Sequence, residues 1–354
     1  LAIVLKSAGF DYPLLHIAGE PSPEDIDAIV RDQREGRWDL VVGIGGGSVL
    51  DGAKAVAGLL RPGNSVMDHL EGVGPELPYR GPTTPFIAVP TTAGTGSEAT
   101  KNAVLTRQGP EGFKKSFRDE ALMAEYAIVD PELLASCPPD LIAANGMDAL
   151  TQLLESYLST RANPITDALA LAGLAAVRDG LLAWYQGGAE AAAGRERMAL
   201  AALLSGICLA QTGLGSVHGL AQPLGSLFRI PHGVVCGTLV AAASRVNIAA
   251  LREREAGGLG LAKYATVGRL LADSSLANAD ALEALVATLE AWTGLMRLPT
   301  LDRLGVTAAD FPRIVAASRN SSMKTNPMVL TDDEIKYILR RRLANGPSSL
   351  GGGS

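Results

Sequence analysis

The sequence predicts an α/β domain with a parallel sheet, followed by an all-helical domain. Strand and helix signals alternate through the first part of the chain, and such alternation favours a parallel sheet that helices cover on both faces. After Asp140 the pattern changes to Ala- and Leu-rich helical segments, without a convincing strand. The length of 354 residues also favours two domains. We expect the α/β domain at 1–135, the helical domain at 136–345 and a flexible tail at 346–354.

The beginning of the chain predicts a helix over Leu1–Ala8, where an α/β domain normally has a strand. We therefore expect the first strand of this domain to be missing from the sequence. A short apolar run at 14–18 predicts a strand. The next helix should begin after Ser22 and end near Gly36, because Ser is a good N-cap and Pro23 suits the first helical position.

Four further strands are predicted in the α/β domain. Two are buried apolar runs, at 39–45 and 84–92, and each leads into small residues. A helix is expected at 48–60 between them, and shorter strands at 102–106 and 126–129. In an open parallel sheet, ligands bind beyond the carboxyl ends of the strands. The small residues that follow the strands at 39–45 and 84–92 therefore predict a binding cleft.

The helical domain is predicted from apolar residues that recur at helical spacing between Gly and Pro breaks. The expected helices lie at 146–160, 165–186, 189–211, 231–250, 259–273, 278–296 and 331–343.

Composition excludes several classes of partner. The chain has 31 Lys and Arg against 37 Asp and Glu, a net charge of −6, and no basic stripe, so no nucleic-acid partner is expected. No apolar run reaches the roughly 18 residues that a membrane span needs, so no membrane association is expected. Cys137, Cys208 and Cys236 are widely spaced, and we interpret them as buried thiols of a cytoplasmic protein.

A glycine-rich turn separates the first buried strand from its helix. Gly46 and Gly47 would let the backbone approach a phosphate closely, and the helix that starts near Ser48 would supply free N–H groups and the positive end of its dipole. The spacing differs from GxGxxG, so a tight turn without a ligand stays open as the alternative. Asp51 either lies beside the ligand or simply stabilises the helix dipole.

Five motifs follow one another over nearly the whole chain from Gly36. They are Gly45–Lys54, Pro90–Glu98, Gly146–Thr151, His218–Gly225 with Pro231–Gly233, and Ser321–Pro327 with Leu330–Glu334. In this order they resemble the iron-containing (group III) alcohol dehydrogenase family. The resemblance implies a dehydroquinate synthase-like fold with an N-terminal dinucleotide-binding domain, a helical domain for metal and substrate, and a homodimer.

By this resemblance, NAD or NADP would bind at the two small-residue turns and at a few positions beyond them. The choice between the two cofactors stays open, because the discriminating residue would lie in the missing N-terminal part. Alternatively, Lys114 would simply be a solvated lysine on the protein surface. The implied cofactor contacts are Gly46, Gly47, Ser48, Asp51, Thr91, Thr92, Thr95, Thr100, Asn102, Lys114 and Leu133.

The resemblance also implies a divalent metal, iron or zinc, held by one Asp and three His. The matching positions are Asp148, Gln152, His218 and His232. Asp148 and Gln152 are spaced i, i+4 and share a helix face. Since an amide is a poorer ligand than imidazole for zinc and iron, we expect weaker metal binding. The alternative is a metal-free cleft in which both histidines are simply hydrogen-bonded.

The implied activity is hydride transfer between the nicotinamide and a metal-polarised alcohol or aldehyde. Many family members have a histidine at the position of Gln222, and glutamine does not titrate, so no catalytic acid or base is assigned. Three alternatives remain. They are a maleylacetate reductase-like enzyme, a lyase-type relative similar to dehydroquinate synthases, and a cofactor-binding protein with weakened catalysis.

Overall fold

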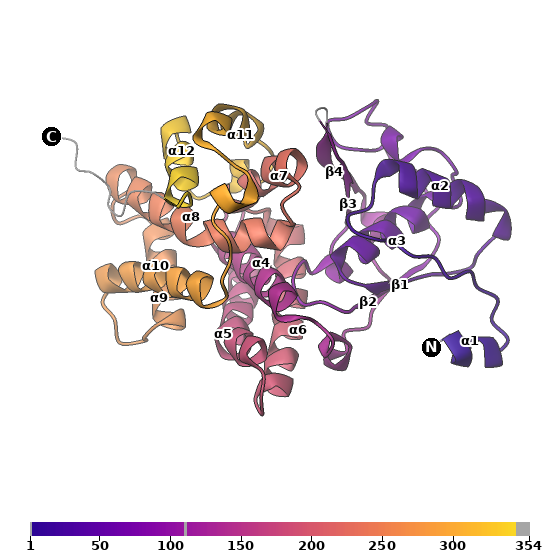
Figure 1. Cartoon of the computed structure of the whole chain (residues 1–354), viewed down its shortest axis with the longest axis horizontal. Coiled ribbons are helices and arrows are strands. Elements are labelled where there is room, and N and C mark those ends of the chain that lie inside the picture. Colours follow the sequence, from indigo (N-terminus) through magenta and orange to yellow (C-terminus); the bar gives the residue numbers. More distant parts are fainter. Residues whose placement is uncertain (1, 110–111, 345–354) are drawn as a thin grey trace.

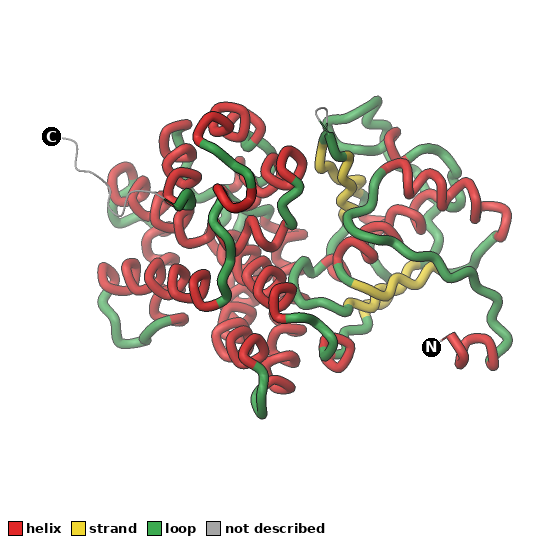
Figure 2. Tube along the Cα trace, in the orientation of Figure 1, coloured by secondary structure: helices red, strands yellow, loops and turns green. Residues whose placement is uncertain are grey.

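The computed structural model describes residues 2–109 and 112–344, and the predicted fold class is confirmed. An α/β region and a helical region lie side by side (Figure 1). In Figure 2 all the strands fall in the α/β region. The change from strands to helices lies between Ala127 and Pro139. The predicted tail at 346–354 lies outside the described residues.

The α/β region alternates helices and strands over most of its length. α2 begins as predicted, with Ser22 and Asp25 forming a capping box. Apart from short 3₁₀ turns, its elements are α1 (Ala2–Ser7), α2 (Pro23–Gln33), β1 (Val41–Gly45), α3 (Gly47–Leu59), β2 (Phe86–Pro90), β3 (Asn102–Arg107), β4 (Phe113–Arg118) and β5 (Tyr126–Ala127).

Three of these strands form a parallel sheet in the order β1-β2-β5. Gly45 at the end of β1 is in register with Pro90 at the end of β2, so the turns that follow the two strands are adjacent. α3 covers this sheet, and Leu50, Ala53 and Ala57 pack with Phe86 and Ala88. This packing fixes the first turn of α3 beside the strand ends.

One expectation for this region was wrong, and one strand was missed. The run at 14–18 forms no strand: Leu14 is 70% exposed and Leu15 is 45% exposed, so its apolar character does not reflect a place in a sheet. β3 is the strand predicted at 102–106, and it pairs antiparallel with β4 instead of joining the parallel sheet. β4 itself was missed by sequence reasoning. The sequence of β4, Phe-Lys-Lys-Ser-Phe-Arg, lacks the apolar run expected of a buried strand.

The helical region contains the predicted helices, with α7 and α11 in addition. α7 was missed because Pro223 and several glycines interrupt its apolar pattern. The longer elements of the helical region are α4 (Pro139–Leu158), α5 (Pro164–Gln186), α6 (Ala191–Thr212), α7 (Ser216–Phe228), α8 (His232–Arg254), α9 (Leu259–Leu271), α10 (Asn278–Leu295), α11 (Phe311–Ala317) and α12 (Asp332–Arg341).

α4 and α8 pack against each other in the core of the helical region. Among the described residues, α8 is the single helix that is by itself long and apolar enough to cross a membrane, and most of that stretch is buried inside the protein. A helix that is apolar all round is what the core of a large folded region requires. The burial of α4 and α8 means that any polar side chain they carry inward must have a partner.

Candidate active site

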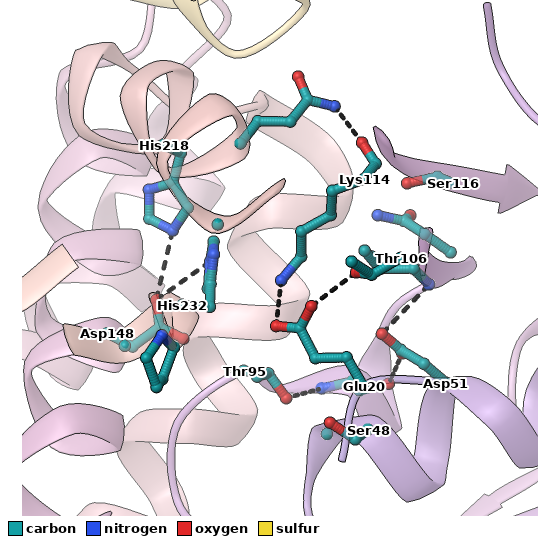
Figure 3. A pocket seen from close by; sticks show the side chains of 18 of the residues that line it. Glu20, Ser48, Asp51, Thr95, Thr106, Lys114, Ser116, Asp148, His218 and His232 are labelled. Atoms are coloured by element: carbon teal, nitrogen blue, oxygen red, sulfur yellow. Dashed lines mark hydrogen bonds and ion pairs between the residues drawn. The ribbon is translucent and has the colours of Figure 1, made fainter. Parts of the chain in front are cut away.

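A cavity of about 1040 Å³ lies between the α/β region and the helical region. Its walls combine the small-residue turns after β1 and β2 with side chains from α4, α7 and α8. Figure 3 shows these side chains directed toward the shared space. The cavity is at the upper end of the size range of small-molecule sites, so it has room for a dinucleotide and a small substrate together.

The α/β wall is built on the N-terminus of α3. Gly46 is the N-cap of this helix, and Gly47 and Ser48 form its first turn. A Cβ added to Gly47 would lie 2.6 Å from Oγ1 of Thr95, so no larger side chain fits without displacing that threonine. The arrangement leaves a short, open backbone whose first N–H groups are free to bind a phosphate.

Most of the predicted cofactor positions line this cavity. Two do not: Thr91 donates its backbone N–H to the carbonyl of Gly45, and Leu133 lies in a 3₁₀ turn and is 37% exposed. The predicted cofactor residues in the cavity wall are Gly46, Gly47, Ser48, Asp51, Thr92, Thr95, Thr100, Asn102 and Lys114.

Asp51 ties α3 to the segment after β2. Its Oδ1 accepts a hydrogen bond from Ser97 Oγ at 2.5 Å, and its Oδ2 accepts one from the backbone N–H of Val104 at 3.2 Å. Burial raises the pKa of Asp51, although the nearby Lys54 ammonium opposes this effect. Asp51 therefore does more than stabilise the helix dipole, because it also positions the wall of the cavity.

Lys54 was missed by sequence reasoning, although it lies within the first quoted motif. Its side chain is fully buried, and Nζ donates to the carbonyls of Ser97 and Asn102 at 2.8 and 2.7 Å and to Thr100 Oγ1 at 3.1 Å. Its i, i+3 spacing from Asp51 was the available signal. The two residues hold the segment that carries Thr100 and Asn102 against α3.

Lys114 is not a solvated surface residue. Its side chain is 11% exposed, and Nζ lies 2.6 Å from Oε1 of Glu20 across the cavity wall. The other Glu20 oxygen accepts a hydrogen bond from Thr106. Against the opposing effect of burial, the Lys114 ammonium lowers the pKa of Glu20. Gln222, on α7, donates to the Lys114 carbonyl and so links the helical region to β4.

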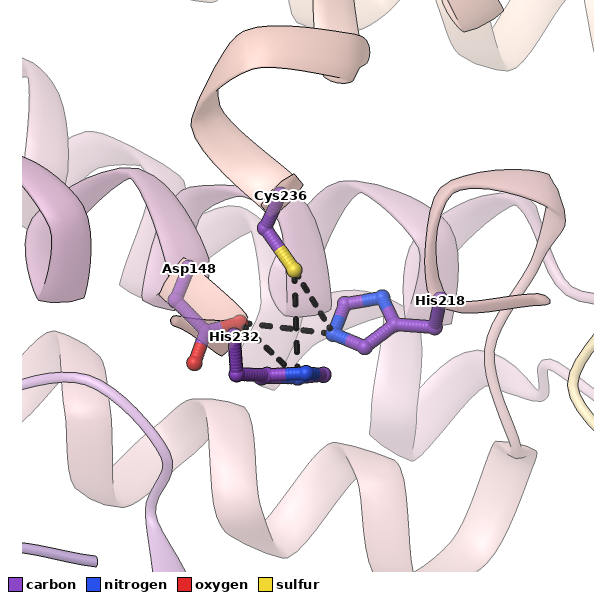
Figure 4. Close-up of side chains that lie close together, drawn as sticks. All are labelled: Asp148, His218, His232 and Cys236. Atoms are coloured by element: carbon purple, nitrogen blue, oxygen red, sulfur yellow. Dashed lines mark hydrogen bonds and ion pairs between the residues drawn. The ribbon is translucent and has the colours of Figure 1, made fainter. Parts of the chain in front are cut away.

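The helical wall brings together four potential metal ligands, Asp148 from α4, His218 from α7, and His232 and Cys236 from α8 (Figure 4). Their donor atoms all lie within 4.8 Å of one another. Nε2 of His218 lies 3.3 Å from Oδ1 of Asp148, and Nε2 of His232 lies 3.7 Å from it. Three of the four positions implied by the resemblance therefore converge, and Cys236 joins them.

The surroundings of this cluster favour a bound cation. Both carboxylate oxygens of Asp148 are buried, and neither has a hydrogen-bond partner of good geometry in the described residues. Nδ1 of His232 is also buried and also lacks such a partner there. Burial lowers the pKa of His232 to about 4. Although burial opposes it, the interactions of Asp148 with His232 and His218 lower its pKa to about 2. A carboxylate and a neutral imidazole are the protonation states that bind metals.

Glu155 supports the cluster from behind and was also missed. Its Oε2 lies 2.7 Å from Nδ1 of His218, and its carboxylate accepts the backbone N–H groups of Gly215 and Val217. With Nδ1 held by Glu155, Nε2 is the nitrogen of His218 that faces Asp148 and is placed to bind a metal. Glu155 follows Asp148 by two helical turns, which places both on one face of α4.

Gln152 lies in the cavity wall one helical turn after Asp148. It is buried, and its amide Oε1 accepts a hydrogen bond from Ser205 Oγ at 3.3 Å. This oxygen is the atom through which glutamine would coordinate a metal. Its role as a ligand therefore stays a prediction, and it has a competing partner.

A glycine turn of the kind that suits a dinucleotide and a buried metal-ligand cluster face each other across one cavity, an arrangement typical of an oxidoreductase site. The chain belongs to the iron-containing alcohol dehydrogenase family. Residues 2–131 match the family description "Iron-containing alcohol dehydrogenase", and residues 142–343 match "Fe-containing alcohol dehydrogenase family, C-terminal". The predicted family is confirmed.

Individual relatives agree with this assignment. The chain is 32% identical to alcohol dehydrogenase 4 of Saccharomyces cerevisiae, over 91% of this chain and 81% of the relative. It is 31% identical to the NAD-dependent methanol dehydrogenase of Bacillus methanolicus, over 96% of this chain and 86% of the relative. A crystal structure of a 1,3-propanediol oxidoreductase superposes with a TM-score of 0.85 and 29% identity, covering 97% of this chain and 87% of that one. The chain is thus an oxidoreductase acting on alcohols.

Proposed function

We propose that the chain interconverts a small alcohol and its aldehyde by hydride transfer to or from NAD or NADP bound in the cavity. The observation that carries this proposal is that the glycine turn of α3 and the Asp148 cluster line the same cavity. A cofactor and a substrate in this cavity would be held together for direct transfer. Holding two reactants in one geometry is itself a large part of catalysis.

The cofactor pyrophosphate is assigned to Gly46, Gly47 and Ser48. The first N–H groups of α3 and the positive end of its dipole favour an anion there. Thr92 and Thr95 stand next to this turn, as the close approach of their side chains to Gly46 and Gly47 shows. Their hydroxyls supply neutral donors and acceptors for phosphate and ribose oxygens.

Asp148, His218 and His232 fit a divalent metal, since they offer a buried, unsatisfied carboxylate and imidazole nitrogens around one point. When bound, such a metal polarises a carbonyl or alkoxide oxygen as a Lewis acid. His232 is the most accessible of the three, with 27% of its side chain exposed. The cluster therefore opens toward the cavity on the side of His232, where a substrate oxygen would approach.

No side chain is assigned to carry the alcohol proton. Gln222 has no titrating group, and its amide N–H is engaged by the Lys114 carbonyl. The proton would leave through water in the cavity or through the ribose hydroxyls of the cofactor. The residues of the chain would then act by binding, orienting and excluding water, rather than by acid–base transfer.

We place the enzyme in the cytoplasm as a homodimer, with a small alcohol or aldehyde as its partner. The cytoplasm is supported by Cys137, Cys208 and Cys236, which are free thiols in the structure. The homodimer follows the family resemblance.

The proposal is tested by following the reduction of NAD and NADP with a panel of primary alcohols and diols, before and after treatment with a chelator. We expect turnover that the chelator abolishes and that added Zn²⁺ or Fe²⁺ restores. Turnover indifferent to the chelator would contradict the role of the Asp148 cluster. Tight cofactor binding without turnover on any alcohol would favour the alternative of a binding protein, which Gln152 and Gln222 support.

A further inference from the structure

We propose that Cys236 is the fourth metal ligand of this chain, so that the metal is held by Asp148, His218, His232 and a thiolate sulfur. The inference rests on the proposed function, because it concerns the metal assigned there. It deepens that function by naming the donor that takes the place left by Gln152. No part of the resemblance implies a cysteine at this site.

The position of Cys236 is the first argument. It follows His232 by one helical turn on α8, so both side chains project from the same face of the helix. Cys236 is fully buried, and its Sγ lies 3.6 Å from Nε2 of His218 and 3.8 Å from Nε2 of His232. Figure 4 shows Sγ directed at the two imidazole nitrogens and the Asp148 carboxylate.

The distances between donor atoms are the second argument. With metal–sulfur bonds of about 2.3 Å and metal–nitrogen or –oxygen bonds of about 2.0–2.1 Å, a tetrahedral site places N and S ligands about 3.6 Å apart and N and O ligands about 3.4 Å apart. The observed N···S distances are 3.6 and 3.8 Å, and the observed N···O distances are 3.3 and 3.7 Å. Four of the six donor–donor distances are thus close to coordination spacing, and all four donor atoms lie within 4.8 Å of one another.

The surroundings of the donors are the third argument. Nδ1 of His218 is engaged by Glu155, so Nε2 is the ring nitrogen directed at the point that Sγ also faces. Both Asp148 oxygens are buried, and neither has a hydrogen-bond partner of good geometry in the described part of the chain. A buried carboxylate that other side chains leave unsatisfied calls for a cation.

A thiolate changes which metal the site selects. Soft sulfur donors favour zinc, whereas carboxylate, carbonyl and water suit magnesium and manganese. A set of one carboxylate, two imidazoles and one thiolate therefore fits Zn²⁺, and it fits Co²⁺ as a spectroscopic substitute. Coordination replaces the S–H bond of Cys236 with an S–metal bond and releases one proton to solvent. Asp148, His218 and His232 line the cavity but Cys236 does not, so the sulfur binds from behind and leaves the substrate side open.

The test is the absorption spectrum of the whole protein, stripped of metal and titrated with Co²⁺. Visible d–d bands report binding of the metal by any set of donors, whereas a sulfur-to-cobalt charge-transfer band in the near ultraviolet requires a bound thiolate. We expect both in the natural protein. Cys236→Ser should lose the charge-transfer band. It should also bind Zn²⁺ at least tenfold more weakly, because changing even a residue that only hydrogen-bonds to a metal ligand lowers metal affinity by about 10- to 100-fold.

Cys208→Ser is the matched control, because Cys208 is also fully buried but lies in α6, away from the cluster. It should keep the charge-transfer band. Cys236→Ala, with circular dichroism to verify folding, repeats the test without a hydroxyl that could itself coordinate. Stoichiometric Co²⁺ binding without the band, or a band that survives in both Cys236 variants, would overturn the inference. Absence of any d–d band would instead overturn the metal site in the proposed function.

Discussion

The two walls of the cavity are built in different ways. In the α/β wall the binding elements are backbone turns, and each follows directly from the strand before it, as Gly46 follows β1 and Thr92 follows β2. In the helical wall the donors are side chains from three separate helices, α4, α7 and α8, and of the four donors only His232 and Cys236 share a helix. One wall depends on local chain geometry, and the other on the packing of helices.

This difference predicts that the two functions can be separated. Changes in the glycine turn should weaken cofactor binding and leave the metal in place, because the donors of the cluster belong to other elements. Changes in the cluster or behind it should weaken metal binding and leave cofactor affinity unchanged. Each prediction below can break this separation, and they run from the largest expected effect to the smallest.

Asp148→Asn should have the largest effect. The substitution keeps the shape of the side chain but removes the charge that the buried cluster uses to hold a cation. We expect turnover to fall about a thousandfold, since Lewis-acid stabilisation is worth several kcal/mol and each about 1.4 kcal/mol is a factor of ten. Calorimetry should show an unchanged cofactor dissociation constant. A parallel loss of cofactor affinity would show that the walls are coupled.

Gly47→Val should act on the other wall. The new side chain would enter the space of Thr95, whose Oγ1 lies 2.6 Å from the position of an added Cβ. Loss of one backbone hydrogen bond to a charged phosphate costs about 1.5–3 kcal/mol, so we expect cofactor binding up to about a hundredfold weaker. Elemental analysis should show full metal content.

Gly294→Val is the matched control for this change, because an added Cβ at Gly294 meets nothing within 4 Å. It should bind the cofactor as the natural protein does. If Gly47→Val also bound the cofactor normally in a calorimetric titration, the assignment of the pyrophosphate to this turn would be refuted.

The same difference explains what the sequence could predict. The glycine turn was predicted because its signal is local: a buried strand, glycines and a helix start occur in one run of residues. The convergence of Asp148, His218 and His232 was predicted only through the family resemblance, since their spacing along the chain does not bring them together. Without that resemblance, two histidines on separate helices would have carried no signal.

Cys236 and Glu155 show the limit of such reasoning. A cysteine one turn after a histidine on an apolar helix is most simply a buried thiol, and only the packing of α7 against α8 places it beside His218. Glu155 lies within an apolar stretch of α4, and nothing near it in sequence reveals that it faces the start of α7. β4 was missed for a related reason, because its partner β3 and not its own composition makes it a strand.

Glu155→Gln should have an intermediate effect. Glutamine keeps one acceptor for the N–H groups of Gly215 and Val217 but loses the charge that orients His218. Outer partners of metal-bound histidines are worth about 10- to 100-fold in metal affinity, and we expect the lower end of that range. Competition with a chromogenic chelator measures the metal dissociation constant. A purely structural role would lower thermal stability but leave metal affinity intact.

Gln222→Ala should have the smallest effect, because Gln222 contributes a hydrogen bond between the walls and not a reacting group. Its Nε2 donates to the Lys114 carbonyl, so the substitution removes one link between α7 and β4. We expect a loss of about 1 kcal/mol in the free energy of unfolding, measured by urea titration. The pH dependence of kcat should keep its shape, since glutamine does not titrate.

Gln222→Glu, which has the same size but no amide donor, should lose the same hydrogen bond. A fall in kcat of more than about a hundredfold in Gln222→Ala, equivalent to about 2.7 kcal/mol, would exceed what one neutral hydrogen bond supplies and would place Gln222 in the reaction itself.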